Sequence, residues 1–197
     1  RMIKESELPK LLIELNGFPL IYYSISYLAK QNVRQIIFIS NDLSKKIEDY
    51  VFKLCSEFKI KSQILHEKNL RGNFGGILEN DGFMPDNFFV IYPDIIWTCD
   101  LSRISKFHAE SQSHVTLVVR RSDHPEDSDT IKLTPLMTVK SIYSKENNSR
   151  PKTWESNDLF GATGIYVMNK EYLALCIQPA VHRQLRRVFL NNRSNRV

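Results

Sequence analysis

The sequence has few cysteines, the residues that form disulfides in small secreted proteins and bind the metal in zinc knuckles. It contains three cysteines in 197 residues, Cys55, Cys99 and Cys176, and no two of them have C-x-x-C spacing. An odd number of widely spaced cysteines argues against a disulfide framework and against a zinc knuckle. This pattern favours a protein of the reducing cytoplasm.

Long hydrophobic runs are also missing. The longest apolar stretch, residues 87–96, is far shorter than the roughly 20 residues that a membrane-spanning helix needs. No basic segment followed by an apolar one stands at the start, so no secretory leader is expected. With 42% hydrophobic and 25% charged residues, the composition is that of a globular domain rather than a disordered or fibrous chain.

Acidic residues are absent from the end of the sequence. From Cys176 to Val197 there is no Asp or Glu, and there are five arginines, at positions 183, 186, 187, 193 and 196. Because the whole chain carries a net charge of +5, residues 1–175 are neutral overall. A basic face for nucleic acid is therefore not implied for the fold itself, and a basic binding arm in the tail is the less favoured alternative. We expect a domain over residues 1–175 and a basic, solvated tail over 176–197.

The apolar pattern predicts strands that alternate with helices. Strands are expected at residues 35–40, 61–65, 87–92 and 114–120, and helices at 19–28, 43–54 and 101–110. The second half is less regular, with short strands at 129–133, 138–142 and 164–168 and a polar loop at 145–159. This order indicates one α/β domain of three layers, α/β/α, with a mostly parallel mixed sheet.

Three weak signals for chemistry lie in the first hundred residues. Asp94 follows an apolar strand, where open α/β sheets bind ligands, and its carboxylate suits Mg²⁺; a turn-capping Asp is the alternative. Gly72, Gly75 and Gly76 allow close approach of a base or phosphate, or form a plain surface turn. Lys10, after Pro9, has the charge to neutralise phosphate, or is an ordinary exposed lysine.

Other groupings have a simpler interpretation. The stretch D-H-P-E-D-S-D holds His124, Asp127 and Asp129, but this spacing is no known zinc set and predicts a solvated acidic loop. The glycine segment lacks the Gly-Lys-Ser/Thr ending of a Walker loop. No G-x-S-x-G is present to support Ser-His-Asp catalysis.

In order and spacing, these signals together resemble the sugar-phosphate nucleotidyltransferases. Residues 8–21, L-P-K-L-L-I-E-L-N-G-F-P-L-I, resemble that family's "LPKPLIEINGKPLI" stretch. Residues 67–80 are similar to its base-binding loop, I-Y-P-D at 91–94 to its metal-binding strand end, and G-I-Y-V at 164–167 to its "GIYV". The stretch D-H-P-E-D-S-D looks like members acting on manno-configured sugars, including mannose 1-phosphate and heptose 1-phosphate guanylyltransferases. The resemblance covers about residues 1–175.

The resemblance implies transfer of a nucleotidyl group from an NTP, with GTP favoured, to a sugar 1-phosphate, with pyrophosphate released and Mg²⁺ as cofactor. It implies an α/β, Rossmann-like fold, a cytoplasmic enzyme, and a homo-oligomer or a fusion to a further enzymatic domain. The residues it assigns are Lys10 and Arg1 for phosphate and catalysis, Asp94 for the metal, Gly72, Asn73, Gly75 and Gly76 for the base, and Lys145 and Gly164 for the sugar phosphate.

Several positions depart from the family pattern. The chain starts at Arg1, which would be the last residue of the family's "GxGTR" loop, and no acidic residue follows Cys176 to serve as a second metal ligand. Asn73 and Phe74 stand where the family has Thr and Ala, and Pro93 stands in place of Gly. The alternative is therefore a non-catalytic relative that binds a nucleotide sugar or a partner subunit, and we expect little activity from the chain as given.

Overall fold

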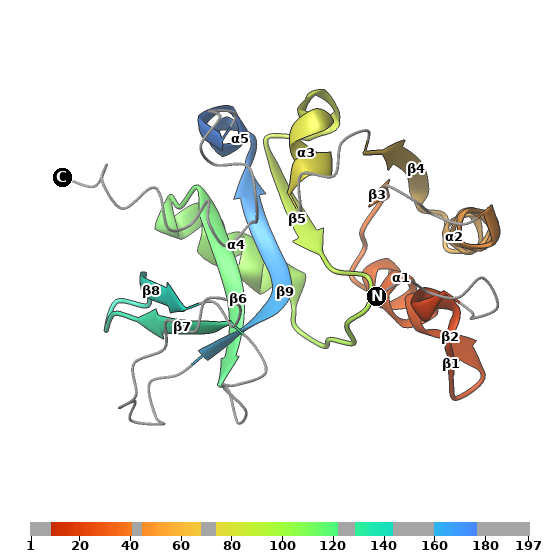
Figure 1. Cartoon of the computed structure of the whole chain (residues 1–197), viewed down its shortest axis with the longest axis horizontal. Coiled ribbons are helices and arrows are strands. Elements are labelled where there is room, and N and C mark those ends of the chain that lie inside the picture. The colour runs from red at the N-terminus through yellow and green to blue at the C-terminus, as the bar shows by residue number, and fades with distance from the viewer. Residues whose placement is uncertain (1–8, 41–44, 68–73, 122–128, 144–159, 177–197) are drawn as a thin grey trace. The chain divides into compact units, whose positions relative to one another are not determined.

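The computed structural model describes residues 9–40, 45–67, 74–121, 129–143 and 160–176. The chain divides into two compact units, one of residues 1–70 and 92–107 and the other of residues 71–91 and 108–197 (Figure 1). Helix α4, Leu101–Ser111, runs through one of the points of division. The sequence pattern predicts a single domain, whereas the structure consists of these two compact units.

The first unit combines a small hairpin, two helices and a two-stranded parallel sheet. In chain order its elements are η1 (Lys10–Leu12), β1 (Glu14–Leu15), β2 (Phe18–Pro19), α1 (Leu20–Lys30), β3 (Gln35–Ser40), α2 (Lys45–Glu57) and β4 (Lys61–His66). Strands β3 and β4 pair in parallel along their whole length. A parallel pair needs a crossover connection, and α2 provides it.

A tight turn joins β1 and β2. Asn16 and Gly17 lie at its centre with φ angles of 49° and 82°. Two consecutive positive φ angles are those of a type I′ turn, whose twist matches that of the flanking strands. The Asn-Gly pair that predicts a turn in the sequence therefore sets the hairpin that follows Lys10.

Both helices of this unit end in the same way. Asn32 (φ 60°) and Lys59 (φ 58°) adopt the left-handed conformation just after α1 and α2. The next residues, Val33 and Ile60, donate their N–H groups back to Leu28 and Cys55 carbonyls, both in the pattern of a Schellman motif. These bonds turn the chain sharply from each helix into the following strand.

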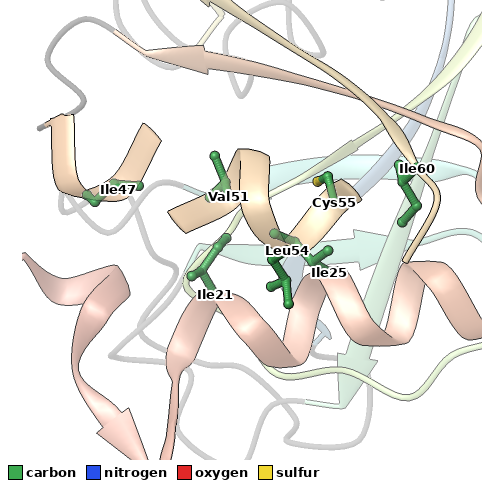
Figure 2. Close-up of a cluster of buried hydrophobic side chains, with 7 residues drawn as sticks. All are labelled: Ile21, Ile25, Ile47, Val51, Leu54, Cys55 and Ile60. Atoms are coloured by element: carbon green, nitrogen blue, oxygen red, sulfur yellow. The ribbon is translucent and has the colours of Figure 1, made fainter. Parts of the chain in front are cut away.

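The core of the first unit lies between α1 and α2. Its buried side chains are Ile21, Ile25, Ile47, Val51, Leu54, Cys55 and Ile60. In Figure 2, Ile21 and Ile25 extend from α1 toward Val51 and Leu54 of α2. Ile36, Phe38 and Ile64 from one face of the β3–β4 sheet pack against the same cluster, together with Leu11 and Leu12 of η1. This packing ties η1, and with it Lys10, to α1.

The second unit is built around one long strand, β9 (Phe160–Asn169). Figure 1 shows β9 between β5 (Asn87–Ile91) and β6 (Val115–Arg121), and both pair with it in antiparallel fashion. The start of β9 also pairs with β7 (Thr130–Leu133), which forms a hairpin with β8 (Val139–Tyr143). The unit also contains α3 (Gly75–Glu79), η2 (Asp81–Phe83) and α5 (Lys170–Cys176).

A bulge interrupts the pairing of β6 with β9. Leu117 faces Tyr166 and Val119 faces Ala162, so three residues of β9 stand opposite one of β6. Gly164 lies in this stretch with a φ of 84°, a conformation that glycine adopts without steric cost. The Thr163 hydroxyl donates a 2.7 Å hydrogen bond to the Val118 carbonyl, which satisfies that acceptor within the bulge.

The predicted strands and helices are present where the structure describes them. Of the strand pairs in the described residues, β3–β4 is parallel and the others are antiparallel. The fold class is α/β as expected, but its pairing is more antiparallel than the alternation of elements suggests. The loop expected at 145–159 and the tail 177–197 lie outside the described residues, so the boundary at 175/176 stays a prediction.

Candidate functional site

Two residues that sequence analysis assigns to phosphate and to metal are in direct contact. The Lys10 Nζ atom lies 2.6 Å from Oδ2 of Asp94, although 84 positions separate the two residues in the chain. The Lys10 side chain is 66% exposed and that of Asp94 is 36% exposed. Ion pairs this accessible to water contribute little to stability. The pair is therefore open to solvent and to a ligand.

Local structure fixes the base of Lys10. Pro9 precedes η1 with an extended backbone, and its carbonyl accepts the N–H of Leu12 at 2.8 Å. Leu11 and Leu12 pack against the core cluster, so the backbone of this short helix is anchored while the Lys10 side chain extends into solvent.

The segment that carries Asp94 is held by helix α1. Asp94 lies in a turn three residues after β5, and the hydroxyl of Ser24 donates to the carbonyl of its neighbour Ile95 at 3.2 Å. Further along, the Gln31 side chain donates to the Cys99 carbonyl at 2.8 Å and accepts the Leu101 N–H at 2.9 Å. Helix α1 and its C-terminal cap residue Gln31 therefore hold the segment that carries Asp94, and the core around α1 also packs against η1, which carries Lys10.

Sequence analysis does not single out Ser24 or Gln31. Ser24 is only 5% exposed and occupies a position on the apolar face of α1, between Ile21 and Ile25. A serine at an apolar position of a helix implies a buried hydrogen bond, and that signal is present in the sequence. The partner of such a bond cannot be read from the spacing, because it lies 71 residues away.

Asp100 caps helix α4. Its Oδ1 accepts the backbone N–H and the hydroxyl of Ser102, at 2.8 and 2.6 Å, and the N–H of Arg103 at 3.2 Å. The hydrogen bond from the Ser102 side chain, followed by that from Arg103, lowers the pKa of Asp100 below its ordinary value. Asp100 thus has a structural role, and Asp94 is the acidic residue of this segment that pairs with a lysine.

Asp94 fits Mg²⁺ only as one ligand among several. Its carboxylate offers the hard oxygen that Mg²⁺ prefers. Among the residues that the structure describes, no group of three or more His, Cys, Asp or Glu side chains gathers into a metal site. Since Mg²⁺ takes six oxygens and usually keeps phosphate and water among them, Asp94 would hold it together with a nucleotide's phosphates.

The glycines assigned to the base belong to the second unit. Gly75 and Gly76 are buried and form the first residues of helix α3 rather than a free loop. Gly164, assigned to the sugar, lies in the bulge of β9 and is needed there for backbone reasons. Their role in binding stays a prediction.

Four further assigned residues lie outside the described parts of the chain. These are Arg1, Gly72, Asn73 and Lys145.

The acidic stretch before β7 needs a correction. His124 and Asp127 lie outside the described residues, but Asp129 is 6% exposed and therefore buried rather than solvated. It immediately precedes β7, whose first residue, Thr130, is fully buried. Asp129 is therefore a buried residue just before β7, not part of a solvated loop.

His108 is a buried histidine of the second unit. Its Nδ1 lies 2.8 Å from the Thr116 hydroxyl and its Nε2 lies 3.3 Å from Oδ1 of Asn87. Because an amide oxygen only accepts, Nε2 carries the proton and Nδ1 accepts from Thr116 in the neutral ring. Burial, and then the nearby His114, lower the pKa of His108. The ring links β5 and β6 and has a structural role.

No helix in the described parts of the chain is long and apolar enough to cross a membrane.

The chain is similar to guanylyltransferases of eukaryotes and archaea. It is 28% identical over 120 residues to the mannose-1-phosphate guanylyltransferase catalytic subunit beta of Danio rerio, covering 59% of this chain and 33% of that protein. It is 29% identical over 167 residues to a putative mannose-1-phosphate guanyltransferase of Sulfolobus acidocaldarius, covering 84% and 44%. The chain thus spans less than half the length of these relatives.

A solved structure has the same fold. HddC from Yersinia pseudotuberculosis, in complex with GMP-PN, aligns with a TM-score of 0.70 and 19% identity, covering all of this chain and 81% of that one. The sequence profile of the nucleotidyl transferase family matches residues 3–187. The chain therefore belongs to the nucleotidyl transferase family.

Proposed function

We propose that this chain takes part in transferring a nucleotidyl group from GTP to a sugar 1-phosphate of the manno type, with Mg²⁺ as cofactor. The observation that carries the proposal is the contact between Lys10 and Asp94 at 2.6 Å, which brings together the lysine expected to bind phosphate and the carboxylate expected to bind the metal. Similarity to proteins named mannose-1-phosphate guanylyltransferases supports the choice of base and sugar.

In this reaction a phosphate oxygen of the sugar 1-phosphate attacks the α-phosphorus of the NTP. A new P–O bond forms, the bond between the α-phosphorus and the bridging oxygen breaks, and pyrophosphate leaves with that oxygen. Negative charge gathers on the phosphate oxygens, so cations that are already in place lower the barrier. The Lys10 ammonium would supply one such charge, at the end of an exposed side chain whose backbone is anchored in η1.

Asp94 supplies the oxygen ligand for the cofactor. When bound, Mg²⁺ neutralises phosphate charge and draws the phosphate oxygens into line. Ser24 and Gln31 position the segment that carries Asp94, since their hydrogen bonds hold its backbone at two points. Positioning of this kind contributes to the rate even though neither residue touches the substrate.

A pyrophosphate-release screen of the four NTPs against several sugar 1-phosphates tests the proposal. We expect release above background with GTP and mannose 1-phosphate, dependence on Mg²⁺, and loss of release in Asp94→Asn. The matched control is Asp49→Asn, because Asp49 also forms an exposed ion pair, 2.9 Å from Lys45, but lies on the surface of α2. Tight GTP binding with no release for any pair would contradict transfer and favour a non-catalytic nucleotide-binding relative.

A further inference from the structure

We propose that Lys10 and a divalent cation are alternative partners of the Asp94 carboxylate, so that Lys10 weakens binding of the cation until a nucleotide is bound. This inference rests on the proposed function, since it assumes that Asp94 is the metal ligand. It goes further by assigning Lys10 a role in the nucleotide-free protein. There, Lys10 holds Oδ2, one of the two carboxylate oxygens that could bind the cation.

The geometry of the pair supports this competition. The Lys10 ammonium donates a hydrogen bond to Oδ2 of Asp94 at 2.6 Å, a short, charge-assisted contact. A cation bound at that carboxylate would lie within a few ångströms of the ammonium and be repelled by it. Lys10 therefore opposes the cation in two ways, by using the oxygen and by its like charge.

Within the described parts of the chain, no group of metal-ligating side chains compensates for this opposition. Among the described residues, no cluster of three or more potential ligands includes Asp94. A single carboxylate, already neutralised by a lysine, is a poor site for Mg²⁺, which gives up its water reluctantly. The nucleotide-free protein should accordingly bind Mg²⁺ and Mn²⁺ only weakly.

A nucleotide changes this balance by offering Lys10 a different anion. Lys10 is 66% exposed on a flexible four-carbon stem, so its ammonium can move from the carboxylate to a phosphate oxygen without disturbing the anchored η1 backbone. The phosphates bring the remaining oxygen ligands at the same time. Binding of the nucleotide would thus both draw Lys10 away from Asp94 and supply the oxygen ligands that the cation still lacks.

Paramagnetic broadening by Mn²⁺ tests the competition without relying on activity. The readout is the NMR amide signal of Ile95, next to Asp94, measured on the full chain with Mn²⁺ alone. We expect weak broadening in the unmodified chain and in Lys10→Arg, which keeps the charge. Lys10→Met, which keeps the length of the side chain, should raise the broadening about threefold, as expected for release of an exposed ion pair.

The second exposed pair of this unit provides the matched control. Lys45→Met frees the Asp49 carboxylate on α2 in the same way. It should increase broadening at Asp49 and leave Ile95 unchanged, which separates local competition from a general change in net charge. Since Lys10 and Lys45 are exposed, both variants should fold.

Two results would overturn the inference: broadening at Ile95 of equal size in the unmodified chain, Lys10→Arg and Lys10→Met, or none in any of them. Failure of the proposed function would appear in a different measurement. In that case, adding GTP would fail to increase the Mn²⁺ broadening at Ile95 in the unmodified chain, whatever Lys10→Met does with Mn²⁺ alone.

Discussion

The Lys10–Asp94 pair should matter far more for ligand binding than for stability. The two side chains are 66% and 36% exposed, so water screens their attraction strongly. Measured couplings of such exposed pairs are about 0.2–1 kcal/mol. A structural, buried pair would behave differently, because removal of one partner typically costs about 3–5 kcal/mol. The size of the coupling therefore distinguishes a functional pair from a structural one.

A double-mutant cycle measures this coupling. The variants are Lys10→Met, Asp94→Asn and the double variant, and the assay is urea unfolding followed by circular dichroism. We expect a coupling free energy of about 1 kcal/mol or less, similar to that of a parallel cycle on Lys45 and Asp49. A coupling above about 3 kcal/mol would refute the reasoning, since it would mean that the pair holds the first unit together.

Three further predictions concern the two units of the fold. Gly17→Ala should lower the free energy of unfolding by about 1–2 kcal/mol, because Gly17 has a φ of 82°, although nothing lies within 4 Å of the added Cβ. The control Gly82→Ala, where the added Cβ also meets nothing within 4 Å, should be close to neutral, and an equal loss of unfolding free energy in both variants would contradict this. Ser24→Ala removes the donor to the Ile95 carbonyl and should lower the free energy of unfolding by about 1 kcal/mol. It should also weaken Mg²⁺-dependent GTP binding measured by calorimetry, and unchanged binding would argue that Ser24 does not position Asp94. Because the pKa of His108 is lowered in the folded chain, the unfolded chain binds a proton first as the pH falls. The contribution of His108 to the free energy of unfolding is therefore complete above about pH 6.5 and is lost as the pH drops toward the folded-state pKa. Urea unfolding between pH 7.5 and 5.5 should show this fall in unfolding free energy, and His108→Gln should make it smaller.

Much of the local structure follows from short-range pattern. The β-branched run at residues 35–40 forms β3, and the helical spacing of Ile47, Val51 and Leu54 forms the buried face of α2. The Asn16-Gly17 pair, a typical turn dipeptide, forms the turn between β1 and β2. Each of these signals acts between residues that are close in sequence, so it can be recognised before the fold is known.

The predicted site is only partly a consequence of such patterns. Asp94 and Lys10 could be named individually, but their contact depends on the packing of α1 against both segments, through Leu11 and Leu12 on one side and Ser24 on the other. Long-range contacts of this kind leave no periodicity in the sequence.

Burial of single polar residues was the least predictable feature. Asp129 stands in a stretch rich in charge, which favours a solvated loop, yet it is buried at the position just before β7. The conformation of Gly164 likewise depends on a register shift between β6 and β9, whose strands are distant in sequence. For Gly164 the pairing with a distant strand, not the local sequence, sets the backbone environment.

Calorimetric titration of GTP into the chain, with and without Mg²⁺, tests most directly whether Lys10 and Asp94 form a nucleotide site. We expect GTP binding that strengthens when Mg²⁺ is present. Asp94→Asn should lose the Mg²⁺ dependence, Lys10→Met should weaken binding under both conditions, and Asp49→Asn should behave as the unmodified chain. GTP binding that is equally tight in all four proteins, with the same response to Mg²⁺, would contradict the assignment of both residues.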